Sequence, residues 1–405
     1  MGVFYLRFST RATIGWLILT WAAVACAPAA QGAELKIVGE AAVLMEMHTG
    51  KILWQRNKDL SMAPASTTKI MTALIVLERN KLSDITIVPA EATSATGGTA
   101  KLQKNERLAI EQLLFAMLIG SANDAAVTLA KHTGGSVAKF VGMMNNKARG
   151  LGALQSSFRN PTGLPEKGHV TTARDLAVIT RAALQHPEFR RIVAAKQHPW
   201  KSAEWQGTLK NSNDLLDNYP GAIGVKTGST REAGFCLVGA AARGTETFIA
   251  VILKSSEKAV WEDARILLDH GFRNFSAMSL VEPGKTILTS KVDGKKVAIA
   301  AAAPAHYVGP TNDGRPPQMQ IALDELALPI AKGEIVGEAV FRKGDKELAR
   351  VDLISRVAVP RRPFDLSRIL AAAGAVLLAL FLLLLRRHRR RKRYIFARRG
   401  NRLRF

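Results

Sequence analysis

An apolar run near the C-terminal end limits what the rest of the chain can fold into. Ile369 to Leu385 contains 17 residues without a charged or strongly polar side chain, the short limit for a helix that spans about 30 Å of hydrocarbon. Residues 386–405 follow with 11 Lys or Arg and no acid, and basic flanks of this kind stay in the cytoplasm. We therefore predict a transmembrane helix at 369–385 and a cytoplasmic tail at 386–405, with the preceding residues on the extracytoplasmic face.

The opposite end has the pattern of a secretory signal peptide. Two arginines precede the apolar run Ile14 to Ala25, and small residues follow it, an order that predicts a cleaved signal at 1–33. An uncleaved N-terminal anchor is the alternative. Lipid attachment at Cys26 is a second, minor alternative, because the residues before Cys26 lack a large apolar side chain. Cys236 is the only other cysteine, so the exported part has no internal disulfide.

The formal net charge of +24 belongs in part to these two ends. Subtracting the 11 tail charges and the two arginines of the signal leaves +11 on the exported part. Attraction to anionic lipid headgroups or wall polymers accounts for such a surface. An exported chain without a recognisable nucleic-acid module is not expected to bind nucleic acid.

Between the ends, the elements follow the order strands, helices, strands. Apolar runs bounded by turn residues indicate the strands, and longer apolar segments with helix-start signals indicate the helices. The predicted strands are 41–47, 51–54, 224–230, 234–241 and 247–253, and the predicted helices include 70–77, 110–119 and 173–183. We predict an α+β fold in which the first strands join the last in one sheet, covered by a helical region.

The composition shifts after Phe275. Short apolar alternations follow, broken by Gly-Lys and Asp-Gly turns and with few helix signals. We predict a main domain at 34–275, a small all-β domain at 276–359, and a linker at 360–368 that leads to the membrane helix.

The first of three short motifs pairs Ser66 with Lys69. In a helix this spacing places the hydroxyl and the amine on one face. A serine hydroxyl is a weak nucleophile until a neighbour takes its proton, and a lysine in a core near a second cation has a lowered pKa and can act as that base. Ser-x-x-Lys also occurs at Ser136 and Ser255, so the motif alone is close to background.

The other two motifs supply what acyl transfer still needs. Ser121 and Asn123 fall in the predicted turn between two helices, where Ser121 can relay a proton and Asn123 can offer its amide to a peptide carbonyl. Lys226, Thr227 and Gly228 lie on a predicted strand. There the cation attracts a carboxylate, Thr227 adds a hydroxyl, and Gly228 lets a peptide approach the strand edge.

Other polar residues are weaker candidates. His169 is interpreted as a loop histidine with no part in this scheme. Glu166 lies where a deacylating glutamate would be sought, but Val170 stands four residues on. The histidines are scattered and no cysteine cluster occurs, so we predict neither a metal nor a cofactor.

These residues resemble the D-alanyl-D-alanine carboxypeptidases, the low-molecular-mass penicillin-binding proteins among the penicillin-recognising serine acyltransferases. The resemblance covers residues 35–255 well, and Leu326 to Val357 resembles the end of the family's β domain. The segments that carry it are Ala63-Pro64-Ala65-Ser66-Thr67-Thr68-Lys69-Ile70-Met71-Thr72, Gly120-Ser121-Ala122-Asn123-Asp124-Ala125, Asn160-Pro161-Thr162-Gly163-Leu164, Thr172-Ala173-Arg174-Asp175-Leu176, Asn211-Ser212-Asn213 and Gly224-Val225-Lys226-Thr227-Gly228.

The resemblance implies a β-lactamase/transpeptidase-like catalytic domain at 34–275. It implies that the substrate is the D-Ala-D-Ala end of peptidoglycan stem peptides, and that β-lactams inhibit the enzyme by acylating Ser66 as mimics of that substrate. The residue roles that it implies are nucleophile for Ser66, base for Lys69, second catalytic element for Ser121 and Asn123, and substrate binding for Lys226 and Thr227.

Two features depart from the family pattern. Some relatives carry a basic residue where this chain has Ser212, so a contact to the substrate carboxylate is absent or differently supplied. The better-known members are anchored by an amphipathic helix that lies on the membrane, whereas this chain is predicted to span it.

The leading hypothesis is a membrane-anchored, exported serine-type D-Ala-D-Ala carboxypeptidase. A DD-endopeptidase that acts on peptidoglycan crosslinks would use the same three motifs. A β-lactamase is disfavoured because no Glu-x-x-x-Asn follows the middle motif in the expected loop. A non-catalytic binder of wall peptides would require a damaged motif, and all three motifs are intact.

Overall fold

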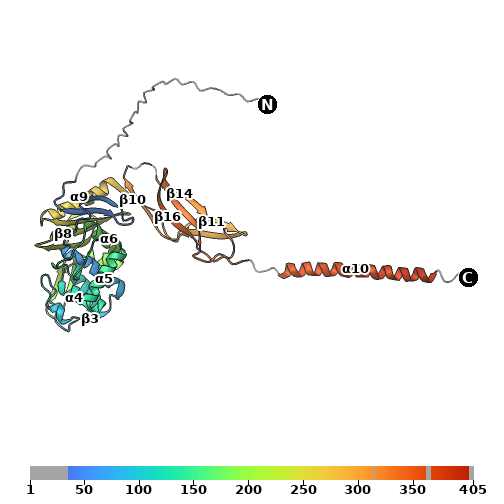
Figure 1. The fold of residues 1–405 in the computed structure, drawn as a ribbon, viewed down its shortest axis with the longest axis horizontal. Coiled ribbons are helices and arrows are strands. Elements are labelled where there is room, and N and C mark those ends of the chain that lie inside the picture. Colours follow the sequence, from blue (N-terminus) through green and yellow to red (C-terminus); the bar gives the residue numbers. More distant parts are fainter. Residues whose placement is uncertain (1–34, 313, 315, 362–365, 401–405) are drawn as a thin grey trace, which may run out of the picture. The chain divides into compact units, whose positions relative to one another are not determined.

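The computed structural model describes residues 35–312, 314, 316–361 and 366–400 (Figure 1). The predicted signal peptide at 1–33 and Cys26 lie outside the described residues.

A five-stranded antiparallel sheet organises the residues before position 275. The strand order is β2-β1-β9-β8-β7, so β7 and β2 are its two edges. Strand β1 is buried along its whole length and pairs with β9, with Val43 opposite Val251. The first strands therefore join the last ones, as the element order predicts. The strands are β1 (Ala41–Glu46), β2 (Ile52–Arg56), β7 (Ala222–Thr230), β8 (Gly234–Arg243) and β9 (Glu246–Ser255).

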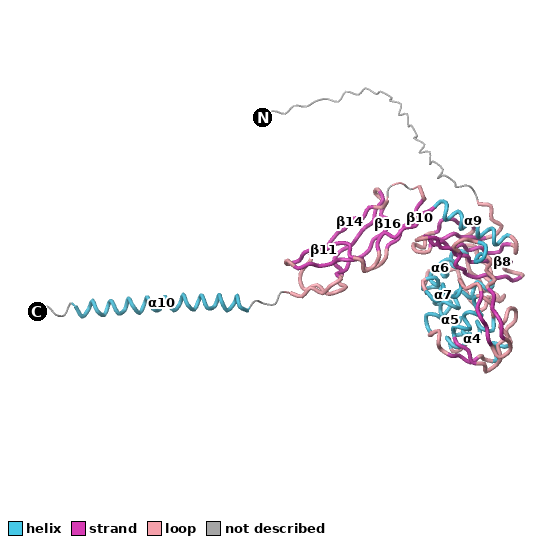
Figure 2. The backbone as a smooth tube through the Cα atoms, turned by 180° about the vertical axis from the view of Figure 1, so that it is seen from behind, coloured by secondary structure: helices cyan, strands magenta, loops and turns pink. Residues whose placement is uncertain are grey.

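Helices cover both faces of this sheet. Helix α9 packs on one face, against β9 and β8, and α6 packs on the other face together with the helical region (Figure 2). The helices are η1 (Ala65–Thr68), α1 (Lys69–Arg79), α2 (Ala90–Thr93), α3 (Ile110–Leu118), α4 (Asn123–Gly134), α5 (Val137–Gly150), α6 (Ala173–Leu184), α7 (Pro187–Val193), α8 (Leu215–Asn218) and α9 (Ala259–Asn274). Two two-stranded antiparallel sheets pair β3 (Ile85–Ile87) with β4 (Arg107–Ala109), and β5 (Gln197–Lys201) with β6 (Gln206–Lys210).

Apolar packing explains why α1 can carry the first motif. Every residue from Lys69 to Val76 is buried, and most of this segment belongs to the core that also contains β1 and α3. A helix that is apolar nearly all round has to lie inside a domain. Its first residues are thereby held away from solvent.

All elements described between residues 275 and 361 are strands. Their bounds are β10 (Phe275–Val281), β11 (Thr286–Val292), β12 (Lys295–Ala301), β13 (Ala305–Pro310), β14 (Gln318–Leu323), β15 (Ile335–Lys343) and β16 (Lys346–Ser355). Strand β10 pairs with β13, and the other five form a sheet of order β11-β12-β16-β15-β14 around their own apolar core. The prediction of a C-terminal all-β region is confirmed.

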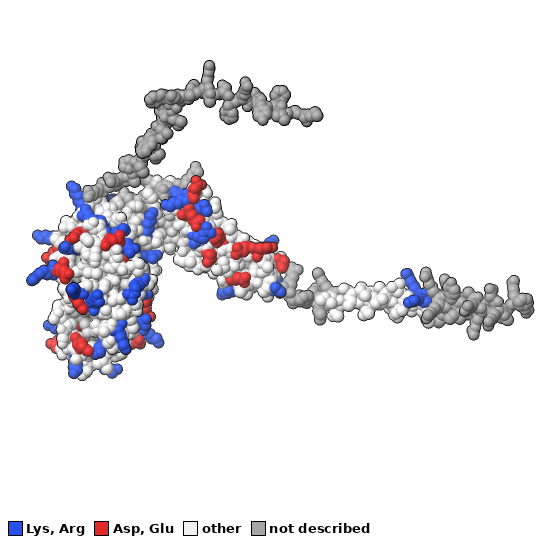
Figure 3. Space-filling model, in the orientation of Figure 1, with Lys and Arg blue, Asp and Glu red and all other residues white. Residues whose placement is uncertain are grey.

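Helix α10 (Leu366–Gly400) is longer than the predicted membrane helix. Its segment Ile369–Arg389 is long and apolar enough to cross a membrane. In Figure 3 the surface of this segment is uncharged up to the arginines at its C-terminal end. The helix continues beyond the predicted end at Leu385 into the basic residues.

Candidate active site

Ser66 lies in a tight 3-10 turn, η1, that runs directly into α1. The sequence predicted it in the first turn of an α-helix. The turn is tighter because Thr67 donates both its N–H and its hydroxyl to the carbonyl of Pro64, while Ala65 takes a φ of 47°. Lys69 still lies three residues on, and its Nζ is 2.9 Å from Ser66 Oγ.

Lys69 Nζ has three hydrogen-bond partners and no exposure to solvent. They are Ser66 Oγ at 2.9 Å, Asn123 Oδ1 at 2.6 Å and the backbone carbonyl of Thr162 at 2.9 Å. A charged ammonium donates to all three. Only the Ser66 hydroxyl can also donate a proton, because the other two partners are carbonyl oxygens. When the amine is neutral, its lone pair is therefore directed at Ser66.

Two effects favour that neutral form. Burial is the larger, and the nearby charge of Lys226 is the second. Together they hold the pKa of Lys69 well below its ordinary value, against the opposing charge of Asp124. Burial also lowers the pKa of Lys226 to about 7. The lowered pKa values increase the fraction of each amine that is neutral at a given pH.

The second motif lies in the turn between α3 and α4, as predicted. Ser121 has a φ of 57°, and Asn123 begins α4. Both ends of the Asn123 amide are held, since its Oδ1 accepts from Lys69 and its Nδ2 donates to the carbonyl of Thr96 at 2.6 Å. One amide proton of Asn123 remains for a ligand.

The third motif lies on β7, the edge strand beside Ser66. Lys226 is buried and donates to the carbonyl of Thr227 at 2.9 Å. A Cβ on Gly228 would lie 2.6 Å from the backbone nitrogen of Ser66, so only glycine lets the strand come this close. Ser212 Oγ is 2.7 Å from Thr227 Oγ1. The residue that departs from the family pattern therefore pairs with Thr227.

A cavity of about 410 Å³ joins the three motifs. Ser66, Ser121, Asn123, Thr227 and Gly228 all line it. The two lysines lie beneath it, buried. The structure thus brings together all seven residues that the sequence singles out. Their catalytic and binding roles remain predictions.

A backbone carbonyl that sequence reasoning missed completes the surroundings of Lys69. Thr162 O belongs to a loop in which Asn160 Oδ1 accepts from the N–H groups of Thr162 and Gly163. Gly163 has a φ of 85°, and a Cβ there would lie 1.8 Å from the carbonyl oxygen of Ala65. The Asn-Pro-Thr-Gly sequence is typical of a loop, but nothing in it indicates a contact with Lys69.

His169 fastens the same loop to the nucleophile turn. Its Nδ1 accepts the N–H of Arg159 at 3.2 Å, and its Nε2 lies 2.9 Å from Thr68 Oγ1. Burial lowers the pKa of His169 to about 4, so the ring is neutral and its Nε2–H donates to Thr68. The interpretation as a loop histidine is right about its position but missed this contact. Glu166 is exposed, accepts from Asn160 Nδ2, and does not line the cavity.

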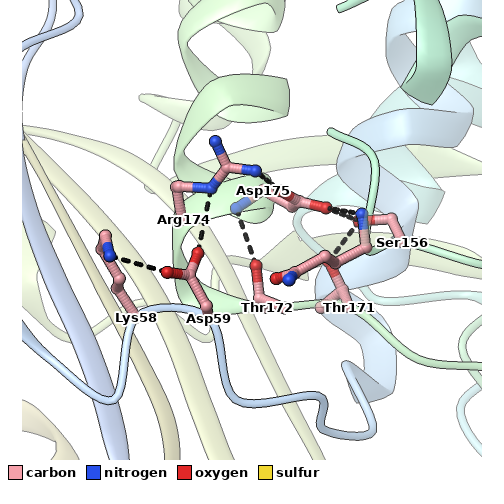
Figure 4. Close-up of polar contacts among 8 residues, drawn as sticks. Lys58, Asp59, Ser156, Thr171, Thr172, Arg174 and Asp175 are labelled. Atoms are coloured by element: carbon pink, nitrogen blue, oxygen red, sulfur yellow. Dashed lines mark hydrogen bonds and ion pairs between the residues drawn. The ribbon is translucent and has the colours of Figure 1, made fainter. Parts of the chain in front are cut away.

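A polar cluster supports the chain on the way to Ser66 (Figure 4). The buried carboxylate of Asp175 accepts from the N–H of Gln155 and the hydroxyl of Ser156. Ser156 in turn contacts Thr171 at 2.8 Å, and the backbone of Thr171 exchanges two hydrogen bonds with Met62, four residues before Ser66. The cluster therefore anchors the segment that enters the nucleophile turn.

Comparisons with known proteins agree with this geometry. A model of the D-alanyl-D-alanine carboxypeptidase family matches residues 27–257, and a model of the penicillin-binding protein 5 C-terminal domain matches residues 275–361. The chain is 32% identical over 372 residues to the D-alanyl-D-alanine carboxypeptidase DacF of Bacillus subtilis, covering 88% of this chain and 96% of the relative. It is 30% identical over 332 residues to DacC of Escherichia coli, covering 77% and 82%.

Solved structures give the same fold. Penicillin-binding protein 5 from Haemophilus influenzae superposes with a TM-score of 0.68 at 28% identity, covering 82% of this chain and 100% of that structure. Penicillin-binding protein 6B from Escherichia coli superposes with a TM-score of 0.64 at 29% identity, covering 80% and 97%. The predicted fold class is confirmed.

Proposed function

Because the chain belongs to the D-alanyl-D-alanine carboxypeptidase family, we propose that it is an exported, membrane-anchored enzyme that removes the terminal D-Ala from peptidoglycan stem peptides through an ester on Ser66. Family membership makes it a serine-type D-Ala-D-Ala carboxypeptidase, a hydrolase. The observation that carries the proposal is the buried Lys69 amine, whose one partner able to donate a proton is the Ser66 hydroxyl 2.9 Å away.

In acylation, the neutral Lys69 amine takes the proton of Ser66 as Oγ attacks the carbonyl carbon of the penultimate D-Ala. The backbone N–H of Ser66 and a backbone N–H of β7 after Gly228 stabilise the oxyanion. The C–N bond then breaks, and the proton returns through Ser121 to the departing amine of D-Ala. A new ester joins the acyl group to Ser66.

In deacylation, water replaces the departed D-Ala. Lys69 accepts a proton from this water as the water attacks the ester carbonyl. When the C–O bond to Ser66 breaks, Lys69 returns the proton to Ser66 Oγ, which regenerates the hydroxyl and the neutral amine. Before acylation, Asn123 holds the acyl-side amide, while Lys226 and the Thr227 hydroxyl bind the terminal carboxylate of the D-Ala that is to leave. A β-lactam follows the first half of this path, but its leaving nitrogen stays tethered to the acyl group, so the ester persists and the enzyme is inhibited.

One experiment tests the ester and the substrate together. The full chain, in detergent micelles, is incubated with a labelled penicillin and separately with a pentapeptide ending in D-Ala-D-Ala. Mass spectrometry then locates the adduct, and free D-alanine is measured. We expect a stable adduct on Ser66 and release of D-alanine, both of which Ser66→Ala abolishes.

The other outcomes separate the alternatives. An adduct elsewhere, or none, would contradict the Ser66 mechanism. Rapid release of hydrolysed penicillin would favour a β-lactamase. A Ser66 adduct without D-alanine release would leave a DD-endopeptidase or a binder of wall peptides.

The topology is a separate part of the proposal. The apolar segment Ile369–Arg389 of α10 supports a single membrane crossing, with the catalytic region outside and the basic residues inside. Protease added to intact cells or spheroplasts should leave the residues after Arg387 uncut. Digestion of this tail without lysis would contradict the proposed orientation.

A further inference from the structure

The cavity beside Ser66 has a second wall that the proposed mechanism does not use. Phe235 and Leu237 on β8, with Val260 and Trp261 at the start of α9, line it. Leu237 and Val260 are buried, while Phe235 and Trp261 are half-buried. We call these four residues the apolar wall.

Strand register places the apolar wall beside the end of the site that is proposed to bind the substrate carboxylate. Leu237 lies opposite Thr227, and Phe235 lies opposite Ser229. The hydroxyls of Thr227 and Ser212 form the pair described above. A residue whose carboxylate lies at Thr227 therefore has its own side chain within reach of the wall.

The charges around the cavity restrict what that side chain can be. None of the 17 described residues that line the cavity is charged. The two buried lysines already have proposed partners, Ser66 for Lys69 and the terminal carboxylate of the substrate for Lys226. An ionised side chain would lose hydration there without gaining an opposite charge. Methylene groups would instead be removed from water against Trp261 and Phe235, the two half-buried members of the wall.

We propose that the apolar wall binds the side chain of the residue that leaves, so that the enzyme releases C-terminal D-amino acids with unbranched aliphatic side chains faster than it releases D-alanine. This inference rests on the proposed function of Ser66. The reaction is unchanged: the same amide bond breaks, the same ester forms, and the leaving amine takes the proton. A chain of several methylenes has more apolar surface to bury against the wall than a single methyl group has.

The test uses the full chain in detergent micelles and four peptides that differ only in the last residue. These residues are D-alanine, D-2-aminobutyrate, D-norvaline and D-norleucine, and the released amino acid gives kcat/KM for each. We expect kcat/KM to rise with length, by at most about fourfold per methylene, the factor for complete burial of each group.

Matched variants locate the effect. Trp261→Gln removes apolar surface from the wall and should flatten the series, whereas Trp261→Leu keeps an apolar side chain and should retain most of the slope. Trp54→Ala removes a half-buried tryptophan on β2, the opposite edge of the same sheet, and should leave the series as in the wild type. Stoichiometric penicillin labelling of each variant counts the folded sites, so that kcat/KM refers to active enzyme.

Three results would overturn the proposal. In the wild type, kcat/KM could stay constant or fall as the side chain lengthens. Trp261→Gln could also lower kcat/KM by the same factor for all four peptides. In peptides that keep D-alanine as the leaving residue, kcat/KM could instead rise with the length of the acyl-side side chain and depend on Trp261. That result would place the wall on the other side of the scissile bond. Failure of the proposed function looks different, because it removes the Ser66 adduct itself.

Discussion

Ser66 with Lys69 and Ser136 with Lys139 have the same spacing, and each pair lies at the start of a helix. At the first, Lys69 is buried and its amine contacts Ser66 Oγ. At the second, Ser136 Oγ caps α5 by accepting the backbone N–H of Lys139, while the Lys139 side chain is exposed. The spacing brings a hydroxyl near a lysine in both regions, but only Lys69 has the burial and the amine partners that its proposed role as a base requires.

The third copy of the motif supports the same lesson. Ser255 is buried, and its hydroxyl donates to Asp263 at 2.7 Å. Lys258 is exposed. Because no buried lysine accompanies it, Ser255 makes a structural contact with Asp263.

Replacing each serine by alanine should have effects of different kinds. Ser66→Ala removes the nucleophile and should lower kcat for D-alanine release by at least about 10⁴-fold, with little change in the free energy of unfolding. Ser136→Ala removes a helix cap and should lower that free energy by about 1 kcal/mol, with kcat unchanged. Kinetics and urea denaturation measure the two. Loss of activity in Ser136→Ala at full stability would break the comparison.

A glycine beside each serine gives the second contrast. Gly163→Ala places a Cβ against the carbonyl oxygen of Ala65 at a positive φ and should destabilise the protein by about 3 kcal/mol or more, with activity lost as the loop moves. Gly135→Ala also has a positive φ but meets no atom within 4 Å, so about 1 kcal/mol is expected. Thermal and urea denaturation compare them. Equal losses of unfolding free energy in the two variants would mean that the contact with Ala65 does not constrain the loop.

The charge of Lys226 should be visible in the pH profile. Lys226→Gln removes a cation that lowers the pKa of Lys69, so the neutral base would form only at higher pH. The acid limb of the penicillin acylation rate should move to higher pH, and the rate at pH 7 should fall roughly in proportion to the neutral fraction of Lys69, about tenfold if its pKa rises by about one. Lys139→Gln, in the exposed pair, should leave the profile unchanged. Movement of the acid limb to lower pH would contradict the assigned charges.

The smallest effect concerns the clamp between His169 and Thr68. Thr68→Val and His169→Gln should each lower the acylation rate only a few-fold, consistent with one buried hydrogen bond of about 1 kcal/mol. The double variant should raise the activation free energy of acylation by less than the sum of the two single effects, since both substitutions remove the same hydrogen bond. Full additivity would show that the two side chains act independently.

Acid stability gives a second measurement of this clamp. The pKa of His169 is lowered to about 4 in the folded chain, and the unfolded chain binds its proton near pH 6.5. Stability from the neutral ring is therefore complete above pH 6.5 and is lost as the pH falls toward 4. The free energy of unfolding of the wild type should fall more steeply across this range than that of His169→Gln.

The parts of the site that the sequence predicted are those carried by side chains in local patterns. Ser66 and Lys69 are linked by helical spacing, and the joining of the first strands to the last in one sheet followed from apolar runs at the two ends of the catalytic region. The Thr162 carbonyl could not be predicted, because a backbone atom has no residue signature. The contact of His169 with Thr68 joins positions 101 residues apart, which only the tertiary fold brings together.

The apolar wall was missed for a different reason. Helix α9 was not predicted, although Val260, Ala264, Leu267 and Leu268 have the spacing of a buried helical face. That pattern could have revealed the helix. It could not have revealed that the first turn reaches the cavity, which depends on how α9 packs on β8.

The most direct test of Lys69 as the base is the rate at which labelled penicillin acylates Ser66 in Lys69→Met, with Lys139→Met as the matched control in the exposed pair. Rapid quenching and peptide mapping by mass spectrometry give the rate and the site in the full chain. The account predicts a Ser66 adduct at the wild-type rate in Lys139→Met and a loss of about 10²-fold or more in Lys69→Met. Acylation of Ser66 at the wild-type rate in Lys69→Met would contradict it.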